Sequence, residues 1–418
     1  MKSLLHKLNP RFPKDFVLSI FANTFSYLVT FCGAVIYVRL LGKSSYGLYT
    51  FAFNIISLFF LINAFGAASG ILQYVSKAKT DAEQHEYLRF AFQMGSVFNV
   101  GMSLLIIIYA LYFPLPIPQA KPVLLAMSLF PIMRLYIDLF PAYLRATQQN
   151  IAQARFAITN SITLLLCNFI GVWLFHLYGL IFSTYILYIG MFIYTTYKLK
   201  LSHLFILSKF PTVNRRQFIG YSFFSSLSNA FSGLLFVLDI LIISYIIKDT
   251  NLIATYKVAT IIPFAINFVP GLVMNFYYPE FVKNLHDHVK LKQLKQFIRV
   301  RMFIFSFTTS IILILLARPI ILTVFGSHYT ASILPFQIIS FGYWIAATFR
   351  IVNGNILAAH GKAKLSFYLT LMNLLINVAT TYILVKYFSI TGAAIAIVIM
   401  YIVSSVVSQI ALSTIETY

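Results

Sequence analysis

Apolar segments long enough to cross a lipid bilayer follow one another along almost the whole chain. A helix needs about 20 consecutive apolar residues to span the hydrocarbon core of a membrane. Connections are short, the longest being 200–216 and 279–297, so none has room for a soluble domain. Twelve segments have the required length: 16–40, 46–74, 88–112, 121–144, 153–176, 179–199, 217–247, 252–278, 298–323, 332–357, 365–388 and 392–413.

Charged residues are too scarce for a soluble protein. Hydrophobic residues make up 60% of the 418 and charged residues 10%, whereas soluble domains carry about 25% charged residues. We therefore expect an all-α integral membrane protein. Cys32 and Cys167 lie within apolar spans, and we interpret them as small buried side chains rather than as a disulfide or metal site. The first span is too long for the core of a cleaved signal peptide.

The distribution of basic residues predicts the orientation in the membrane. With the N-terminus in the cytoplasm, 22 of the 31 lysines and arginines fall in cytoplasmic segments and seven at the outer ends of spans. This bias is the one that the positive-inside rule describes, so both termini should be cytoplasmic. It also accounts for most of the net charge of +21 without a nucleic-acid partner.

A weak internal repeat divides the spans into two halves. A shift of 213 residues aligns 144–180 with 357–393 without a gap and gives seven identities in 37 positions, among them Gly179 with Gly392. Six spans separate the halves, so the repeats share the same orientation in the membrane. We expect two pseudo-symmetric six-helix lobes around a central cavity. The predicted domains are 1–199, a cytoplasmic linker at 200–216, and 217–418.

Two arginines lie inside predicted spans, Arg134 in the fourth and Arg350 in the tenth. Arginine keeps its proton, and a charge at the centre of a bilayer costs about 2.5–3.5 kcal/mol on insertion scales. Arg134 could attract an anionic substrate or pair with Asp138, four residues on and on the same helix face. No acidic residue shares the helix of Arg350, which could face a cavity or extend to the cytoplasmic headgroups. Both are candidate substrate-binding residues.

Other charged residues near the outer ends of spans leave alternatives open. Asp239 could pair with a cation such as Lys257 or titrate as a coupling site, and Asp138 could gate Arg134. Lys257 could be a cavity cation or an anchor at the interface. Arg39 and Lys43 flank the first outer turn, where they are expected to anchor the interface. Asparagines recur within the spans, which favours hydrogen bonds between helices.

Signatures of catalysis and metal binding do not emerge from the sequence. Tyr37 stands where a phosphate-binding loop ending in Gly42-Lys43-Ser44 would need its first glycine. His286 and His288 diverge on a helix, so a metal site there is not expected. We predict no enzyme activity, no catalytic residue, no metal and no cofactor.

Two motifs resemble those of a known family. RLLGKSSYGLYTFAF at 39–53, with GILQYVSK at 70–77, resembles the N-terminal signature of polysaccharide-export flippases. The stretch from Asn355 to the GAA sequence at 392–394 resembles their eleventh and twelfth helices. The chain therefore looks like a Wzx-type flippase of the multidrug/oligosaccharidyl-lipid/polysaccharide exporter superfamily. The motif match also makes Arg39 a candidate substrate-binding residue.

The resemblance implies a specific function. Wzx-type flippases move undecaprenyl-pyrophosphate-linked oligosaccharides across the bacterial inner membrane for O-antigen or capsule assembly. Expected partners are that glycan lipid, membrane lipids, a polysaccharide polymerase and a chain-length regulator. Two alternatives stay open: a drug or small-molecule antiporter of the same superfamily, and a polysaccharide polymerase, which would carry a long outer loop.

Overall fold

The computed structural model describes residues 14–198, 214–284, 287–360 and 363–416. These residues form helices and short helical turns, as the all-α prediction requires. The helices are α2 (Lys14–Phe60), α3 (Ala67–Tyr74), α4 (Asp81–Tyr112), α5 (Lys121–Ala126), α6 (Phe130–Ala146), α7 (Asn150–Lys198), α8 (Arg215–Ile247), α9 (Thr250–Ile266), α10 (Phe268–Lys283), α11 (His288–Leu315), α12 (Ala317–Ile320), α13 (Ile333–Ile345), α14 (Ile351–Ala359) and α15 (Ala363–Glu416).

Within the described residues, seven helical stretches are long and apolar enough to cross a membrane, or eight with the bent pair formed by α5 and α6. Three of these stretches contain a break in helical geometry, at Gly42, at Phe175–His176 and at Ser389, and so comprise two helices each. With α8, the described residues accommodate the twelve predicted spans. Large apolar side chains such as Trp173, Ile186 and Tyr387 are more than two-thirds exposed, as expected of a surface that faces lipid.

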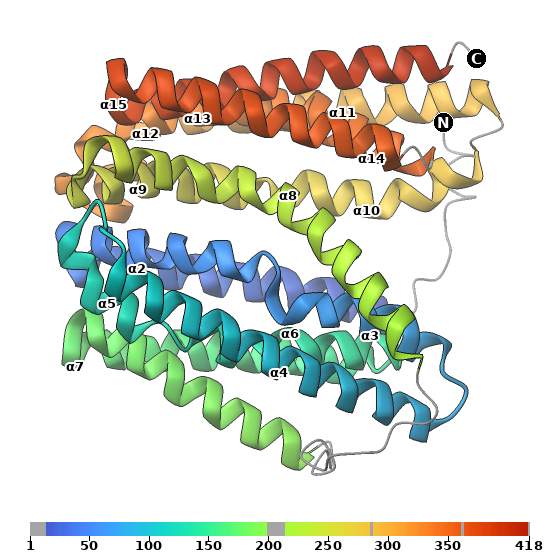
Figure 1. The fold of residues 1–418 in the computed structure, drawn as a ribbon. Coiled ribbons are helices and arrows are strands. Elements are labelled where there is room, and N and C mark those ends of the chain that lie inside the picture. Colours follow the sequence, from blue (N-terminus) through green and yellow to red (C-terminus); the bar gives the residue numbers. More distant parts are fainter. Residues whose placement is uncertain (1–13, 199–213, 285–286, 361–362, 417–418) are drawn as a thin grey trace. The chain divides into compact units, whose positions relative to one another are not determined.

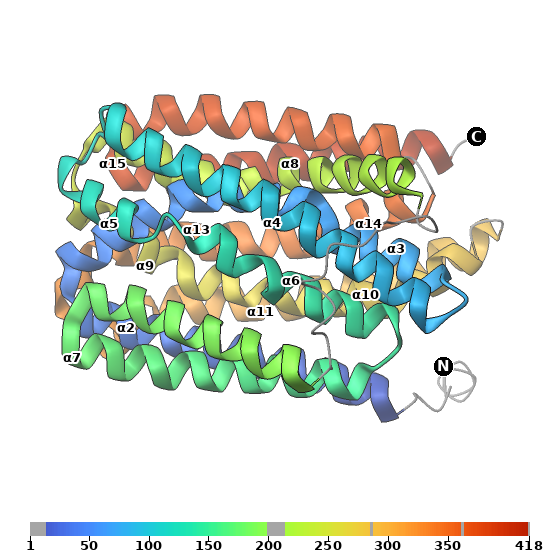
Figure 2. The ribbon, with the colours of Figure 1, turned by 60° about the horizontal axis from the view of Figure 1, so that its bottom comes forward.

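The breaks in α7 and α15 are reversals of the chain. Figure 1 draws each of these helices as two antiparallel rods joined at one end, and Figure 2 shows the same for α7. His176 has φ 48° and ψ −129°, and Ser389 has φ 53° and ψ −138°. The two residues are 213 positions apart, which is the shift of the sequence repeat. The repeat is therefore reproduced in backbone geometry.

The fourth predicted span is bent. The helical stretch Pro118–Ala126 and the helix α6 are inclined by 49° at the break that precedes Pro131. Proline lacks an amide donor, so a helix tends to begin at it. Pro141 lies inside α6 without ending it.

The chain divides into two compact units. Unit 1 takes the described residues within Met1–Ile36, Ile62–Tyr109 and Leu125–Leu227, and unit 2 those within Tyr37–Leu61, Ala110–Leu124 and Ser228–Tyr418. Neither unit is a continuous half of the chain, because residues 37–61 belong to unit 2. The predicted linker at 200–216 lies mostly outside the described residues. The lobe boundaries drawn from the sequence stay a prediction.

Each unit has its own apolar core. In unit 1, aromatic rings from α6 and α7 pack face to face, with the ring centroids of Phe140 and Phe192 6.1 Å apart. The buried Phe218 of α8 packs against Tyr74 and Tyr87 in the same unit. In unit 2, buried side chains of α10, α11, α14 and α15 form a second cluster, which includes Met274, Ile298 and Leu412.

The basic segment 283–299 begins in α10 and ends in α11. It contains the end of α10 and the first turns of α11, so it continues directly into the ninth span. Asp287 caps α11, because its carboxylate accepts a hydrogen bond of 3.0 Å from the amide of Lys290. This hydrogen bond lowers the pKa of Asp287 below its ordinary value.

Candidate functional site

Arg134 and Asp138 form an ion pair on α6. Nε of Arg134 lies 3.1 Å from Oδ1 of Asp138, and the two side chains are 42% and 32% exposed. The i,i+4 spacing predicted this pair. Both side chains retain exposed surface, so the guanidinium can still contact another anion.

Two asparagines extend this pair into a network across three spans. Asn63 donates a hydrogen bond of 2.8 Å to Oδ2 of Asp138 and accepts one of 2.8 Å from Nδ2 of the buried Asn99. Nδ2 of Asn99 also lies 2.6 Å from the carbonyl oxygen of Pro131. The second, third and fourth spans therefore meet at one polar cluster, which agrees with the predicted role of the asparagines.

The same cluster holds a strained turn between α2 and α3. Ala64, Phe65 and Gly66 all have positive φ values, 52°, 54° and 75°. A left-handed conformation costs roughly 1–2 kcal/mol for each residue with a Cβ atom. Oδ1 of Asn99 accepts a hydrogen bond of 2.9 Å from the amide of Ala64, which supports the turn. Strain of this kind persists where the surroundings determine the conformation, and it is common at functional sites.

Asp239 is buried in unit 2 without a cation partner. Its side chain is 4% exposed, and its carboxylate oxygens lie 3.3 Å from the Tyr256 hydroxyl and 3.4 Å from that of Thr381. Asp239 does not form the alternative ion pair with Lys257, because no described cation lies within 4.0 Å of the carboxylate. Lys257 is half-buried on α9, one residue after Tyr256. Adjacent residues of a helix point about 100° apart, so these two side chains diverge.

Arg350 packs against a buried aromatic ring. Its guanidinium carbon lies 5.7 Å from the ring centroid of Tyr401, which is 3% exposed. Among the described residues no carboxylate lies within 4.0 Å of Arg350. Arg350 ends a π-helical turn, Ala346–Arg350, and such turns are frequent at functional sites. Contact with a buried ring favours an interior position over extension to the headgroups.

Arg39 and Lys43 contact a loop within unit 2. The Arg39 guanidinium donates to the carbonyl oxygens of Thr323 and Val324, the latter at 2.7 Å. Lys43 donates to the carbonyl oxygen of His328 at 3.2 Å. Arg39 therefore satisfies carbonyl groups at the end of the π-helical turn Ile321–Phe325, as basic residues often do at helix C-termini.

A third partly buried cation, Arg299, was missed in the sequence. Nη2 of Arg299, on α11, lies 2.7 Å from Oδ1 of Asn353 and 2.8 Å from Oε1 of Gln409. In the sequence, Arg299 is one of the 22 basic residues that fall in predicted cytoplasmic segments. The sequence signal that could have pointed to this site is Asn353. It lies three residues after Arg350 and therefore close to it on the same helix face.

No group of three or more metal-binding side chains occurs among the described residues. Cys32 and Cys167 are free thiols, but Cys32 is exposed and Cys167 is only partly buried, so the interpretation of both as buried side chains is wrong. Asp138 and Asp239, the intramembrane carboxylates, accept hydrogen bonds from neutral donors. Arg134 and Arg350 give the described residues two guanidinium groups within spans that can bind an anion.

Comparison with known proteins identifies the family. The family model described as "Polysaccharide biosynthesis protein" matches residues 12–284, more than half of the sequence. The chain belongs to this polysaccharide biosynthesis family. No curated protein matches the sequence. The predicted resemblance to Wzx-type flippases is confirmed.

Solved structures share the fold of this family member at low sequence identity. The lipid II flippase MurJ, in an inward closed conformation, is 18% identical with a TM-score of 0.76, covering 95% of this chain and 87% of that one. An inward-facing multidrug resistance MATE transporter is 12% identical with a TM-score of 0.75, covering 96% and 99%. A MOP superfamily transporter from Pyrococcus furiosus is 12% identical with a TM-score of 0.69, covering 97% and 96%. The predicted fold is confirmed, and these proteins are named as flippases and transporters rather than enzymes.

Proposed function

We propose that this protein moves undecaprenyl-pyrophosphate-linked oligosaccharides from the cytoplasmic to the outer leaflet of the bacterial inner membrane. The product would serve assembly of a surface polysaccharide such as O-antigen or capsule. Residues 1–199 and 217–418 would act as lobes that alternate between inward-open and outward-open states, with both termini in the cytoplasm. A polysaccharide polymerase and a chain-length regulator would take the product onward.

The observation that carries this proposal is the surroundings of Arg350. A permanent cation within a span, packed on the ring of Tyr401 and with no described carboxylate within 4.0 Å, retains its capacity to bind an anion. A guanidinium binds phosphate oxygens with two parallel hydrogen bonds. Pyrophosphate is the part of the lipid-linked glycan that such a group would recognise. We therefore assign the first contact with pyrophosphate to Arg350.

Arg134 would act later, because Asp138 neutralises it. Oδ1 of Asp138 is held by Arg134 and Oδ2 by Asn63. A substrate phosphate would have to compete with Asp138 for the guanidinium. Asp138 would then gate the cation and restore the pair after release.

A drug antiporter is the competing function. The fold is shared with a multidrug resistance transporter, and Asp239 is a buried carboxylate with neutral partners that could serve an organic cation. The described cations Arg134, Arg299 and Arg350 disfavour such a substrate. Drug sensitivity of a strain that expresses the protein distinguishes the two functions, since an antiporter should raise resistance.

Complementation of a strain that lacks its own flippase tests the proposal. Arg350→Ala should abolish surface polysaccharide, whereas Arg350→Lys should restore part of it, because lysine retains the charge without the fork of donors. Arg318→Ala is the matched control, since Arg318 is an exposed arginine with no described acceptor. Full activity of Arg350→Ala at normal expression would refute the cationic mechanism.

A charge exchange tests whether the position of the Arg134 charge matters. Arg134→Asp combined with Asp138→Arg keeps an i,i+4 pair but moves the cation by about 6 Å along the helix. We expect normal expression and little surface polysaccharide. Full transport by the exchanged pair would mean that the pair is only structural.

The proposed orientation has its own test. A fluorescent reporter that matures only in the cytoplasm, fused after Tyr418, should give a signal. A phosphatase that is active only outside, fused at the same place, should be inactive. The reverse pattern would refute the orientation and leave the fold unaffected.

A further inference from the structure

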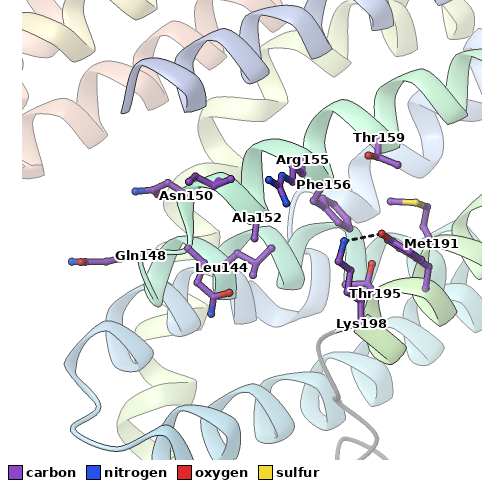
Figure 3. Close-up of a pocket in the computed structure, with 13 residues that line it drawn as sticks. Leu144, Gln148, Asn150, Ala152, Arg155, Phe156, Thr159, Met191, Thr195 and Lys198 are labelled. Atoms are coloured by element: carbon purple, nitrogen blue, oxygen red, sulfur yellow. Dashed lines mark hydrogen bonds between the residues drawn. The ribbon is translucent and has the colours of Figure 1, made fainter. Parts of the chain in front are cut away.

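A cavity of about 500 Å³ lies within unit 1, where the last turns of α6 and the two ends of α7 meet. It exists because α7 reverses at His176, which brings its first turn beside its last. Figure 3 shows side chains from both ends of α7, among them Arg155 and Lys198, around the same space. The sites considered above do not use this cavity.

The charged lining of the cavity is entirely positive. Arg155 and Lys198 line it, and no acidic residue is among the lining residues. Nζ of Lys198 donates a hydrogen bond of 2.9 Å to the hydroxyl of Tyr194 and lies 5.3 Å from the centroid of that ring. These two contacts orient the ammonium group. The cavity therefore favours an anion.

A buried hydroxyl without a partner points to a ligand in the cavity. Thr195 is 5% exposed, lines the cavity, and its Oγ1 has no hydrogen-bond partner among the described residues. A threonine within a helix normally donates to the carbonyl four residues earlier, so this hydroxyl is available. An oxygen of a bound anion could accept its hydrogen bond.

Backbone donors lie beside the same space. The first turn of α7 begins at Asn150, and residues 150–152 line the cavity. The side chain of Gln149, the residue before the helix, donates a hydrogen bond of 3.2 Å to the hydroxyl of Thr147. Backbone amides at the N-terminus of a helix favour phosphate. Two cations, a hydroxyl and the amides thus form a mixed donor set.

Part of the remaining wall is apolar, and so is the neighbouring surface of α7. Leu144, Phe156 and Met191 line the cavity, and nearby side chains of α7, Ile193 and Tyr197, are exposed by 62% and 86%. Basic residues at the ends of membrane helices mark the level of the headgroups. A ligand that places a phosphate in the cavity and hydrocarbon along these exposed side chains matches both features.

We infer that this cavity binds the phosphate headgroup of an anionic glycerophospholipid, in the leaflet that the basic ends of α7 face. The two cations without a carboxylate favour a headgroup of net negative charge over a zwitterionic one. The cavity volume of about 500 Å³ suits a headgroup with its glycerol. The apolar lining residues fit a lipid better than they fit a free phosphate ion. This inference does not depend on the proposed function.

Native mass spectrometry of the purified full-length protein tests the inference. Phosphatidylglycerol should be retained as one molecule per chain, about tenfold more strongly than phosphatidylcholine. Arg155→Gln and Lys198→Gln should each weaken retention about fivefold. Arg145→Gln is the matched control, because Arg145 is exposed at the end of α6 and does not line the cavity.

Thr195→Val separates ligand binding from folding. It removes the unpaired hydroxyl with little change of shape, so the melting temperature without lipid should be unchanged or higher. The rise in melting temperature with phosphatidylglycerol should shrink. A lower melting temperature without lipid, together with an unchanged rise, would contradict the role of Thr195.

Three results would overturn the inference. Equal retention of phosphatidylglycerol and phosphatidylcholine would mean that the cavity does not select anionic lipid. An equal loss of binding in Arg145→Gln would indicate a general surface-charge effect. Displacement of phosphatidylglycerol by millimolar inorganic phosphate would identify a site for free anions.

Discussion

Asn63 donates a hydrogen bond of 2.8 Å to Asp138, the carboxylate that neutralises Arg134. Asn63, which lies between α2 and α3, thereby helps to hold the carboxylate of Asp138 in place beside Arg134 on α6. Without Asn63, Oδ2 of Asp138 would lose its donor and the amide of Asn99 would lose an acceptor. These hydrogen bonds connect the strained turn at residues 64–66 with Arg134, the candidate substrate-binding residue.

We expect Asn63→Leu and Asp138→Leu to be coupled in stability. Each leaves a polar group unsatisfied, at a cost of about 1–3 kcal/mol, and the double variant should lose less than the sum. The measurement is a double-mutant cycle from thermal unfolding in detergent, in which contacting residues show coupling of about 0.5–3 kcal/mol. Asn160→Leu with Asp138→Leu is the control and should be additive, since Oδ1 of Asn160 has no described partner.

Gly179 and Gly392 should resist substitution at both reversals. A Cβ atom at Gly179 would lie 1.8 Å from the carbonyl oxygen of Gly171, and at Gly392 it would lie 2.0 Å from that of Leu384. Gly179→Ala and Gly392→Ala should each cost about 1–3 kcal/mol or more, because overpacking displaces backbone. Gly190→Ala, with no neighbour within 4 Å, should be tolerated. Equal melting temperatures for all three would contradict the close packing.

Asp239 should tolerate asparagine better than leucine. In Asp239→Asn the amide oxygen can still accept from one of the two hydroxyls, Tyr256 or Thr381, and the amide NH2 can donate to the other. Asp239→Leu leaves both hydroxyls unsatisfied, at about 1–3 kcal/mol each. Thermal unfolding should therefore show a larger loss for leucine. If Asp239 also titrates during transport, Asp239→Asn should be stable and inactive. A stable and fully active asparagine variant would remove Asp239 from the mechanism.

Arg39→Ala should loosen the loop that contains Thr323 and Val324. Hydrogen bonds with a charged donor contribute about 1.5–3 kcal/mol each, and two are lost. Hydrogen exchange of the amides at 321–329 should accelerate by tenfold or more. Arg318→Ala, in the neighbouring helix α12, is the control. If exchange in this loop is unchanged, Arg39 is available for substrate, as the motif match suggested.

The reversals of the chain could be anticipated only in part. The 213-residue shift predicted that Gly179 and Gly392 are equivalent, and the backbone breaks at His176 and Ser389 obey the same shift. A positive φ is uncommon for any residue other than glycine, although histidine adopts it more often than most, so composition could not reveal the breaks. Close packing of the glycines against the preceding helix explains why the reversal occurs there.

Some charged side chains within the spans have partners close by in the sequence, and others have partners far away along the chain. The pair of Arg134 with Asp138 was predictable, because four residues of helix separate them. The neutral partners of Asp239 were not, since Thr381 lies 142 residues away along the chain. The same holds for Arg299, which Asn353 and Gln409 bind from two other helices.

The sequence by itself determined the membrane class, the number of spans, the repeat and the family resemblance. These properties depend on hydropathy summed over each segment and on local motifs. They can therefore be read without information on which residues are neighbours in space. The tertiary structure alone decided which partner each intramembrane charge receives, and it alone formed the cationic cavity at the ends of α7. Such pairings depend on the rotation and depth of one helix against another, and packing of whole surfaces sets both.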